Sequence, residues 1–431
     1  MTTGHPLRIA MLSVHTCPLA ILGGKKTGGM NVYVRELSTE LAKRGICVDV
    51  FTRSQDASVP RVNDTALGPG ARVIHLPGGP EYPLSITQVY HHLPQFVENV
   101  RAFAEAESAR YEVLHSHYWL SGWAALELKK VWRVPVIHMF HTLGRMKNRV
   151  AQSEEEREDE LRILTEQDIV ERADCIVAAT AAERIQLMWL YGADMRRIRV
   201  IPPGVNVSHF HPIPKREARR MIGMGEDDLL LLFVGRIEQI KGVDILLRAL
   251  AILRKESERS LQNLCLAIIG GAADDEAEED TELKRLKTLG AELGLDGLVA
   301  FLGAKNQETL QYYYSAAEAV IMPSHYESFG MVALEAMACG TPVVASEVGG
   351  LAYLVQDGVT GLHVPTGDPV ELAGKIRLIL ENEALRREMA AAATAYAQRY
   401  DWSIIAGQIE QLYLEVTGRQ ALDRTPEWQS L

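Results

Sequence analysis

Short apolar runs alternate with helix-like segments along most of the chain. Between the runs, apolar residues recur with helical spacing, for example at Met30–Arg44 and Pro94–Ala106. Strands that alternate with helices assemble into parallel sheets, because each helix carries the chain back to the same edge. The first half therefore predicts a parallel α/β sheet with strands at Ile9–Ser13, Val48–Thr52, Val73–Leu76, Val113–His115, Val134–His138, Cys175–Ala178 and Ile198–Ile201.

The alternation is interrupted by a stretch that is dense in proline. Ile201–Asn206 and Phe210–Pro214 have the composition of a linker. A chain of 431 residues also suits two domains better than one. We therefore predict one domain over residues 1–206 and a second over residues 207–401. The second has expected strands at Leu229–Val234, Cys265–Ile269, Val299–Phe301, Ala319–Met322, Val343–Ala345 and Gly361–Val364.

Composition narrows the class of protein. Acids outnumber bases, 56 to 45, which argues against nucleic acid as a general partner. The acid-rich segment Ser153–Arg172 predicts a long, largely exposed helix. The scattered cysteines lack metal-ligand spacing, so we expect free thiols in a reducing cytoplasm. Leu7–Ser13 does not have the pattern of a signal peptide, and no apolar run approaches a membrane span, so we expect a cytoplasmic protein without a transmembrane segment.

Two glutamates flank a turn in the second half. Ala319–Ser324 fits a strand and Met331–Met337 fits a helix, so Glu327 precedes the helix and Glu335 projects from it. The backbone N–H groups of residues 329–331 are free at such a helix start to bind a polar ligand. Two carboxylates can accept hydrogen bonds from both ends of a nucleotide sugar. The alternative is a pair of ordinary glutamates that the helix dipole favours.

A basic pair lies upstream of these glutamates. The apolar run Leu229–Val234 is followed by Arg236 and Lys241, and then by the amphipathic segment Val243–Arg254. Ligands of open parallel sheets bind at the carboxyl ends of the strands. Arginine offers a fork for two phosphate oxygens and lysine a movable charge, so the pair predicts a diphosphate site. Taken alone, such a pair is equally compatible with ordinary surface charge.

The first strand leads into a glycine-rich loop that ends at Gly28 and Gly29, and a helix follows. This frame allows close approach of backbone to phosphate, although the spacing is neither a dinucleotide fingerprint nor a Walker motif. A plain surface loop is the alternative. His115 and His117 end another strand, but no carboxylate or cysteine clusters with them, so we expect no metal site.

With these motifs the chain resembles the retaining glycosyltransferases of family four, from about residue 7 to residue 416. The family's glutamate pair falls on Glu327 and Glu335, and its phosphate-binding pair falls on Arg236 and Lys241. Within the family, the chain is most similar to the inositol-phosphate N-acetylglucosaminyltransferases of mycothiol synthesis, with bacterial sucrose-phosphate synthases next. The segments that carry this similarity are Thr27–Val34, His115–Gly122 and His141–Leu143.

The resemblance implies a GT-B architecture, in which two Rossmann-like, doubly wound parallel-sheet domains face each other across a cleft. The first domain would bind the acceptor and the second the nucleotide-sugar donor. A last helix, residues 402–417, would cross back to the first domain, with a tail at 418–431.

The resemblance also implies the site residues. Chemistry would rest on Arg236, Lys241, Glu327 and His141. Donor contacts would come from Gly28, Gly29, Lys305, Ser328, Phe329, Gly330, Met331 and Glu335. Acceptor contacts would come from Asn31, Tyr118, Thr142, Lys147 and Arg162.

The expected reaction transfers glucose or N-acetylglucosamine from a nucleoside diphosphate sugar, with uridine as the expected base, to a small sugar or polyol. The leaving phosphate would take the acceptor's proton, so no cofactor is expected. One departure concerns the acceptor, because Ile86 stands where relatives place a lysine on its phosphate. We expect a phosphorylated acceptor held by Arg162 and Lys147, and an unphosphorylated acceptor is the alternative.

The sequence also leaves open transfer to fructose 6-phosphate and a non-catalytic sugar-nucleotide sensor. A pyridoxal-dependent phosphorylase shares the architecture, but it needs a lysine motif for its cofactor that we do not find in this chain. A second copy of the chain is a candidate partner.

Overall fold

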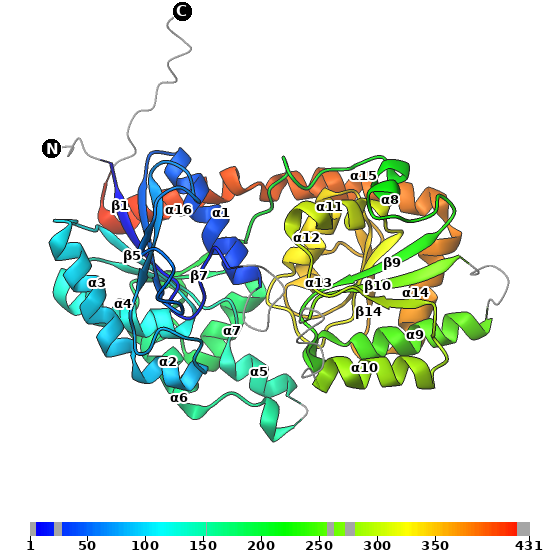
Figure 1. Cartoon of the computed structure of the whole chain (residues 1–431), viewed down its shortest axis with the longest axis horizontal. Coiled ribbons are helices and arrows are strands. Elements are labelled where there is room, and N and C mark those ends of the chain that lie inside the picture. Colours follow the sequence, from blue (N-terminus) through cyan, green and yellow to red (C-terminus); the bar gives the residue numbers. More distant parts are fainter. Residues whose placement is uncertain (1–5, 21–27, 152, 257–262, 272–280, 420–431) are drawn as a thin grey trace, which may run out of the picture.

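The computed structural model of the chain describes residues 6–20, 28–151, 153–256, 263–271 and 281–419. Figure 1 shows two α/β bodies side by side, with α15 above the second and α16 reaching the first. The helices are α1 Gly29–Lys43, α2 Ile86–His91, α3 Leu93–Ala106, α4 Tyr118–Trp132, α5 Gly144–Val150, α6 Glu160–Arg172, α7 Ala181–Tyr191, α8 Lys215–Met221, α9 Val243–Glu256, α10 Thr281–Glu292, α11 Gln307–Ala316, α12 Met331–Ala338, α13 Leu351–Leu354, α14 Pro369–Glu381, α15 Glu383–Ala397 and α16 Trp402–Thr417.

The first sheet has the order β3-β4-β2-β1-β5-β6-β7-β8 and is parallel except for β3. Its strands are β1 Arg8–Leu12, β2 Cys47–Arg53, β3 Val62–Asn63, β4 Ala71–Leu76, β5 Val113–His117, β6 Val136–Met139, β7 Cys175–Ala178 and β8 Ile198–Val200. From β1 the chain adds strands in one direction and then, beginning with β5, in the other. The carboxyl ends of β1 and β5 therefore meet at a topological switch point, where ligands of such sheets bind.

The second sheet is parallel throughout, in the order β11-β10-β9-β12-β13-β14. Its strands are β9 Leu229–Val234, β10 Leu264–Ile269, β11 Val299–Phe301, β12 Ala319–Met322, β13 Val343–Ser346 and β14 Gly361–Val364. Its switch point lies between β9 and β12. The predicted basic pair follows β9 and the first glutamate follows β12, so the topology brings both motifs to one place.

Both faces of each sheet are covered. Along β1, Ile9 and Met11 face a core shared with α1 and α16, whereas Ala10 and Leu12 face a core shared with α3 and α4. This alternation follows from the two-residue repeat of a strand. The last helix is joined to the first body by Tyr413, whose hydroxyl lies 2.7 Å from Nδ1 of His115. The domain boundary at residue 206 stays a prediction.

Two local expectations differ from the structure. Ser153–Arg172 is not one exposed helix but a short 3-10 turn at Glu154–Glu156 followed by α6, in which Arg162 and Glu166 are buried. Polarity predicted exposure there, but the two charges are buried as a pair. The sequence also did not indicate the two-residue strand β3, which lies antiparallel on β4.

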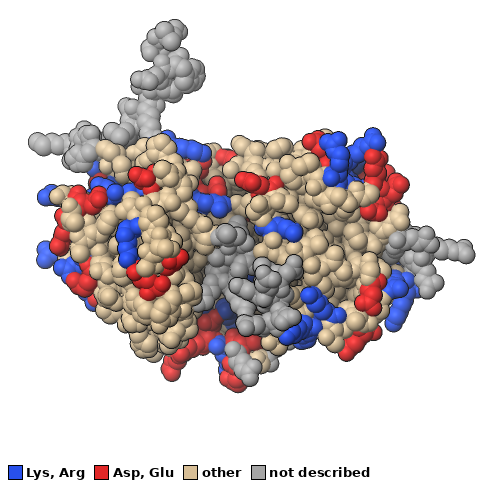
Figure 2. Space-filling view, viewed as in Figure 1, with Lys and Arg blue, Asp and Glu red and all other residues tan. Residues whose placement is uncertain are grey.

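The surface is mixed in charge on the face that Figure 2 shows. Acidic and basic side chains are interspersed over its margins, and they do not gather into a single basic patch there. On this face the charges therefore do not form the basic footprint that a nucleic-acid binder presents.

Candidate active site

A cleft of about 610 Å³ lies between the two bodies, at the carboxyl ends of both sheets. Every residue that the sequence and the resemblance singled out as catalytic, donor-binding or acceptor-binding lines this cleft. Ile86 lines it as well. The motifs are up to three hundred residues apart in the chain, and the fold brings them to one cavity. The structure places these residues together, and their individual roles stay predictions.

The donor side contains a close pair of opposite charges. Lys241 Nζ lies 2.6 Å from Oε2 of Glu327, and both side chains are largely buried. A backbone bond from His325 to Ile240, 2.8 Å long, joins the same two loops. The loop after β9 and the loop after β12 therefore form one unit. The sequence assigned the lysine to phosphate and the glutamate to the hexose, and the structure shows that they also contact each other.

Arg236 differs from Lys241 in its surroundings. Its Nη1 pairs with Oε1 of Glu238 at 2.6 Å, and both side chains are substantially exposed. An exposed ion pair of this kind is weak, because water screens it and long side chains lose entropy in forming it. The guanidinium can therefore exchange Glu238 for a phosphate at little cost.

Two glycines shape the turn before α12. Gly330 has φ of 107°, and a Cβ there would lie 2.6 Å from Cδ2 of Leu351. Gly349 also has a positive φ, and a Cβ there would lie 1.9 Å from the carbonyl oxygen of Glu327. No side-chain hydrogen bond caps α12. The helix start thus faces the cleft with backbone donors that a ligand oxygen can accept.

Glu335 is buried in the cleft wall. Tyr314 donates its hydroxyl hydrogen to Oε2 of Glu335 over 2.7 Å. Burial raises the pKa of Glu335 to about 7, because the charged form loses its hydration there. Tyr314 is a partner that the sequence did not indicate, since the two residues belong to different helices.

Tyr118 and His141 have unusual backbone geometry. Their φ angles are 72° and 62°, in the left-handed region that residues other than glycine rarely adopt. Such strain concentrates at functional sites. Nε2 of His141 lies 3.0 Å from Nδ1 of His117. Burial lowers the pKa of His141 to about 3, which favours the neutral imidazole at physiological pH.

Asn31 holds the end of the glycine-rich loop. Its Nδ2 donates to Oγ1 of Thr16 at 2.6 Å and to the carbonyl of Cys17 at 2.7 Å. Its Oδ1 accepts from the backbone N–H of Gly28 at 3.0 Å. The amide is therefore engaged in shaping the loop. Both of its N–H hydrogens are used, so the expected contact with acceptor hydroxyls would be accepted by the second lone pair of Oδ1. Residues 21–27 of the loop lie outside the described part of the chain.

Arg162 organises the acceptor side. Its Nε donates to Oε1 of Glu166 at 2.7 Å, and its Nη2 donates to the carbonyl and Oγ1 of Thr142 at 2.9 and 3.0 Å. Its Nη1 donates to the hydroxyl of Tyr118 at 3.2 Å and pairs with Glu158 at 3.0 Å. Since both hydroxyl oxygens accept from Arg162, their own hydrogens remain to donate to a ligand.

Two of these partners were missed from the sequence. Glu158 and Glu166 each lie four residues from Arg162, one on either side. For Glu166, which lies on α6 with Arg162, that spacing is a readable signal for an ion pair along a helix, whereas Glu158 precedes the helix. The signal was overlooked because the segment looked like a solvated charged face.

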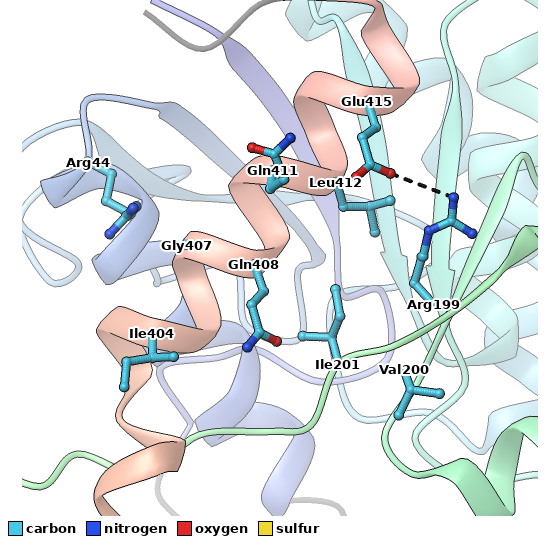
Figure 3. Close-up of a pocket in the computed structure, with 10 residues that line it drawn as sticks. All are labelled: Arg44, Arg199, Val200, Ile201, Ile404, Gly407, Gln408, Gln411, Leu412 and Glu415. Carbon is cyan, nitrogen blue, oxygen red and sulfur yellow. Dashed lines mark ion pairs between the residues drawn. The ribbon is translucent and has the colours of Figure 1, made fainter. Parts of the chain in front are cut away.

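A second hollow, of about 530 Å³, lies where the last helix packs on the first body (Figure 3). Arg199 of β8 pairs there with Glu415 of α16 at 3.6 Å, and Arg44 pairs with Glu410 at 2.6 Å. Figure 3 shows Ile404 and Gln408 along the same helix. None of the expected site residues lines this hollow, and its ion pairs join the crossing helix to the first domain.

The described residues contain neither a metal-binding cluster nor a helix that could span a membrane. No group of three or more histidine, cysteine, aspartate or glutamate side chains there is arranged to hold a metal ion. Among the helices within the described ranges, none has the length and apolarity needed to cross a membrane.

Comparison with known proteins shows the family to which the chain belongs. The family description "Glycosyltransferase Family 4" matches residues 27–209, and "Glycosyl transferases group 1" matches residues 214–396. A D-inositol 3-phosphate glycosyltransferase of Acidothermus cellulolyticus is 42% identical over 398 residues, which are 92% of this chain and 88% of that protein. A D-inositol 3-phosphate glycosyltransferase 2 of Catenulispora acidiphila is 41% identical over 410 residues, 95% of each chain.

Solved structures of glycosyltransferases have the same fold as this chain. The sucrose-phosphate synthase of Thermosynechococcus elongatus matches with a TM-score of 0.87 and 36% identity, over 96% of this chain and 99% of that one. Anabaena HepE in complex with UDP and glucose matches with a TM-score of 0.74 over 95% of this chain and all of that one, and at 21% identity this is a likeness of fold. The predicted family and the predicted GT-B fold are both confirmed. The chain belongs to the family-four glycosyltransferases and is a glycosyltransferase.

Proposed function

We propose that the enzyme transfers a hexosyl group, glucose or N-acetylglucosamine, from a UDP-linked sugar to a hydroxyl of a small phosphorylated polyol of the inositol phosphate kind. The observation that carries the donor half is the joined pair of Lys241 and Glu327 at the switch point of the second sheet. A cation and a carboxylate at one point suit a ligand with a phosphate beside a hydroxylated ring. Relatives named D-inositol 3-phosphate glycosyltransferases support the acceptor.

In the proposed reaction, the bond between the anomeric carbon and the β-phosphate oxygen breaks, and its electrons leave with UDP. Arg236 and Lys241 stabilise that charge as it develops, which lowers the barrier more than it tightens ground-state binding. The acceptor oxygen bonds to the anomeric carbon on the same face, so the configuration is retained. Its proton passes to the leaving phosphate, and neither a protein base nor a cofactor is needed.

The remaining residues position the two substrates. Glu327 and the amides of residues 329–331 orient the hexose, with His141 beside it, and Glu335 binds the ribose. Backbone groups near Lys305 read the base. On the other side of the cleft, Tyr118 and Thr142 donate to the acceptor phosphate, and Lys147 and Arg162 supply its counter-charge. The free cysteines are compatible with a reducing cytoplasm, where we place the reaction.

Two different acceptors also have specific support. The match to a sucrose-phosphate synthase favours fructose 6-phosphate. The apolar Ile86 in the cleft wall favours an acceptor without phosphate. A matrix of UDP-glucose and UDP-N-acetylglucosamine against inositol, inositol phosphate, fructose and fructose 6-phosphate, read by release of UDP, decides among them. Equal rates with and without the phosphate would refute the phosphorylated acceptor, and no UDP release in any combination would refute transferase activity.

A further inference from the structure

The acceptor side of the cleft contains a carboxylate for which the proposed reaction has no role. Oε1 of Glu158 contacts both Nζ of Lys147 and Nη1 of Arg162, the latter at 3.0 Å. We propose that Glu158 is a selectivity residue whose carboxylate occupies the place of the acceptor phosphate in the free enzyme and is exchanged for it on binding. This inference rests on the phosphorylated acceptor of the proposed function.

Counting donors shows why an exchange is required. A guanidinium has five N–H groups, and in Arg162 each of them has an acceptor: Glu166, the two oxygens of Thr142, Tyr118 and Glu158. The contact with Glu166 is buried, and one of the two contacts with Thr142 is to a fixed backbone carbonyl. An acceptor phosphate can therefore reach Arg162 only by taking over a donor of Nη1. Of the acceptors on Nη1, Glu158 is the anion.

The local charge balance leads to the same conclusion. Lys147 from α5 and Arg162 from α6 are matched by Glu158 and Glu166, and α2 contributes only the uncharged Ile86 and Thr87 to the wall. Asp159 also lines the cleft. With Glu158 in place the acceptor site offers no net positive charge. When that carboxylate moves away, the net charge of these five side chains rises from −1 to 0, so a negative charge that opposes the phosphate is removed.

Glu158 can move without disturbing its backbone. Its N–H donates to Oδ1 of Asn148 at 2.6 Å, and its carbonyl accepts from Nδ2 of the same residue at 3.4 Å. Asp159, the next residue, caps α6 by accepting from the N–H of Leu161 at 3.0 Å. The Glu158 side chain is 20% exposed, so water is available to it. Rotation of the side chain alone, with the main chain clamped, completes the exchange.

The exchange gives selectivity by competition. A phosphate monoester carries up to two charges and three strong acceptor oxygens, whereas the carboxylate carries one charge. Burial alone would raise the pKa of Glu158, but the charges of Arg162 and Lys147 lower it below its usual value, so the competitor stays ionised at neutral pH. A neutral polyol cannot displace it. The internal anion weakens acceptor binding, and it weakens binding of poorly charged compounds most.

The test compares Glu158→Gln with Glu160→Gln. Glu160 is exposed, lies two residues away and does not line the cleft, so its replacement removes the same charge without touching the site. With inositol phosphate as acceptor, Glu158→Gln should lower KM by about tenfold, the scale of one charge-assisted hydrogen bond, and leave kcat unchanged. The KM for unphosphorylated inositol and both constants of Glu160→Gln should change by less than about twofold.

A structural role for Glu158 predicts the opposite sign. If the carboxylate only orients Lys147 and Arg162, its loss loosens them and raises KM. An unchanged or raised KM for inositol phosphate in Glu158→Gln therefore overturns the proposal. Thermal melting checks that the variant folds. Should Glu158→Gln unfold, Glu158→Asp, which draws the carboxylate back by one methylene, replaces it. Its KM for inositol phosphate should also decrease, by a smaller factor, and an unchanged or raised KM overturns the proposal.

A binding measurement separates this inference from the proposed function. Calorimetric titration of inorganic phosphate into the enzyme requires no donor and no turnover. Glu158→Gln should bind phosphate about tenfold more tightly than the unmodified protein or Glu160→Gln, and equal affinities overturn the role of Glu158. If tighter phosphate binding accompanies a lack of transfer to every phosphorylated acceptor, the proposed function fails while the exchange at Glu158 stands.

Discussion

At the residue scale, the donor site couples charges that the sequence treated separately. Because Lys241 lies 2.6 Å from Glu327, removing either side chain changes the state of its partner. A glutamate without its lysine is a partly buried, unpaired anion, whereas a lysine without its glutamate is free to move to a phosphate. The two carboxylates of the motif are also unlike, since Glu327 is paired with a cation and Glu335 with a tyrosine hydroxyl.

This difference predicts distinct effects of Glu335→Ala and Glu327→Ala. Glu335→Ala should weaken binding of UDP by about tenfold, because the ribose loses a carboxylate hydrogen bond. Glu327→Ala should lower kcat by more than about tenfold, because the hexose loses the carboxylate that orients it. UDP affinity should stay within about threefold, because Lys241 is then free to bind the phosphate. Calorimetry with UDP and steady-state kinetics distinguish the two effects. Equal losses of UDP affinity in both variants would contradict the assignment.

Glu335 also predicts a pH dependence. Its pKa is raised to about 7 by burial, so the folded protein holds a proton on it that the unfolded chain releases near its usual value. The free energy of unfolding should therefore fall as pH rises from about 4.5 to about 7, and this contribution should be flat above that. The ribose hydroxyls bind the ionised form, so affinity for UDP-glucose should increase through pH 7.

The control for this titration is Glu335→Gln, which keeps the size of the side chain and cannot ionise. UDP-glucose is the probe because both of its phosphates are esterified. It therefore lacks the terminal phosphate that titrates near neutral pH in UDP. Affinity measured from pH 5.5 to 8.5 should rise in the unmodified enzyme and be flat in the variant. A rise of the same size in Glu335→Gln would assign the titration to another group.

Ile86 predicts a gain of acceptor affinity. It is the first residue of α2 and lines the cleft on the acceptor side. Ile86→Lys should lower the KM for inositol phosphate by about tenfold, by supplying a charged hydrogen bond, and should leave the KM for inositol within about twofold. Ile86→Met, which keeps the wall apolar, is the control. The same decrease for both acceptors would mean that phosphate does not bind near α2.

Arg162 is less suitable for that experiment than its sequence position implied. It is 2% exposed and its Nε binds the fully buried Glu166. Removing it leaves a buried carboxylate unpaired, which costs about 3–5 kcal/mol in comparable cases. A raised KM in Arg162→Ala would therefore mix lost phosphate binding with lost structure.

At the element scale, the strands were the most predictable part of the fold. Leu229–Val234, Ala319–Met322 and Gly361–Val364 were predicted with the bounds observed, because a buried parallel strand is a short apolar run bounded by polar or turn residues. Segment 153–172 was not predictable in this way. Its burial depends on Arg162 finding Glu166 and Glu158, and a polarity pattern carries no record of such partners.

The same limit applies to the site. The rule that ligands bind at the carboxyl ends of parallel strands located Arg236, Lys241 and Glu327 in the predicted site, and the structure brings them to one cleft. Sequence reasoning could not see that Asn31 is engaged by its own loop or that Tyr314 binds Glu335. The contact of Tyr314 with Glu335 joins two helices, and Asn31 reaches Thr16 and Cys17 at the far end of its loop. Motif spacing does not describe such contacts.

The loop between β9 and α9 predicts a coupled pair of effects. Arg236→Ala and Lys241→Ala should each reduce kcat by more than about tenfold, since both act on charge that grows in the transition state. If both serve one phosphate, the double variant should lose less than the product of the single effects. Glu238→Ala is the control, because it removes only the exposed partner of Arg236. A single variant with normal kcat would place that residue outside the reaction.

At the scale of the whole molecule, an acidic protein holds an anionic ligand by local arrangement. The net charge is −11, and the cavity at the carboxyl ends of the two sheets is lined by equal numbers of basic and acidic side chains. The placement of the individual cations, and not an excess of them, therefore has to hold the anionic ligand. The crossing helix α16 packs on α1, and Arg44 pairs with Glu410 across that contact at 2.6 Å. Because the last helix is held by the first body, the chain connects the two bodies a second time, in addition to the linker at residues 201–214.

This arrangement predicts that transfer does not depend on a divalent cation. Arg236 and Lys241 face the position expected for the diphosphate, and within the described ranges no three acidic, histidine or cysteine side chains are arranged as metal ligands. Side-chain cations then supply the stabilisation of the leaving group that a bound metal supplies elsewhere. Initial rates of UDP release after exhaustive treatment with EDTA should stay within about twofold of the untreated rate. Loss of activity that magnesium or manganese restores would show that a metal completes the site, and the roles of Arg236 and Lys241 would then have to be reassigned.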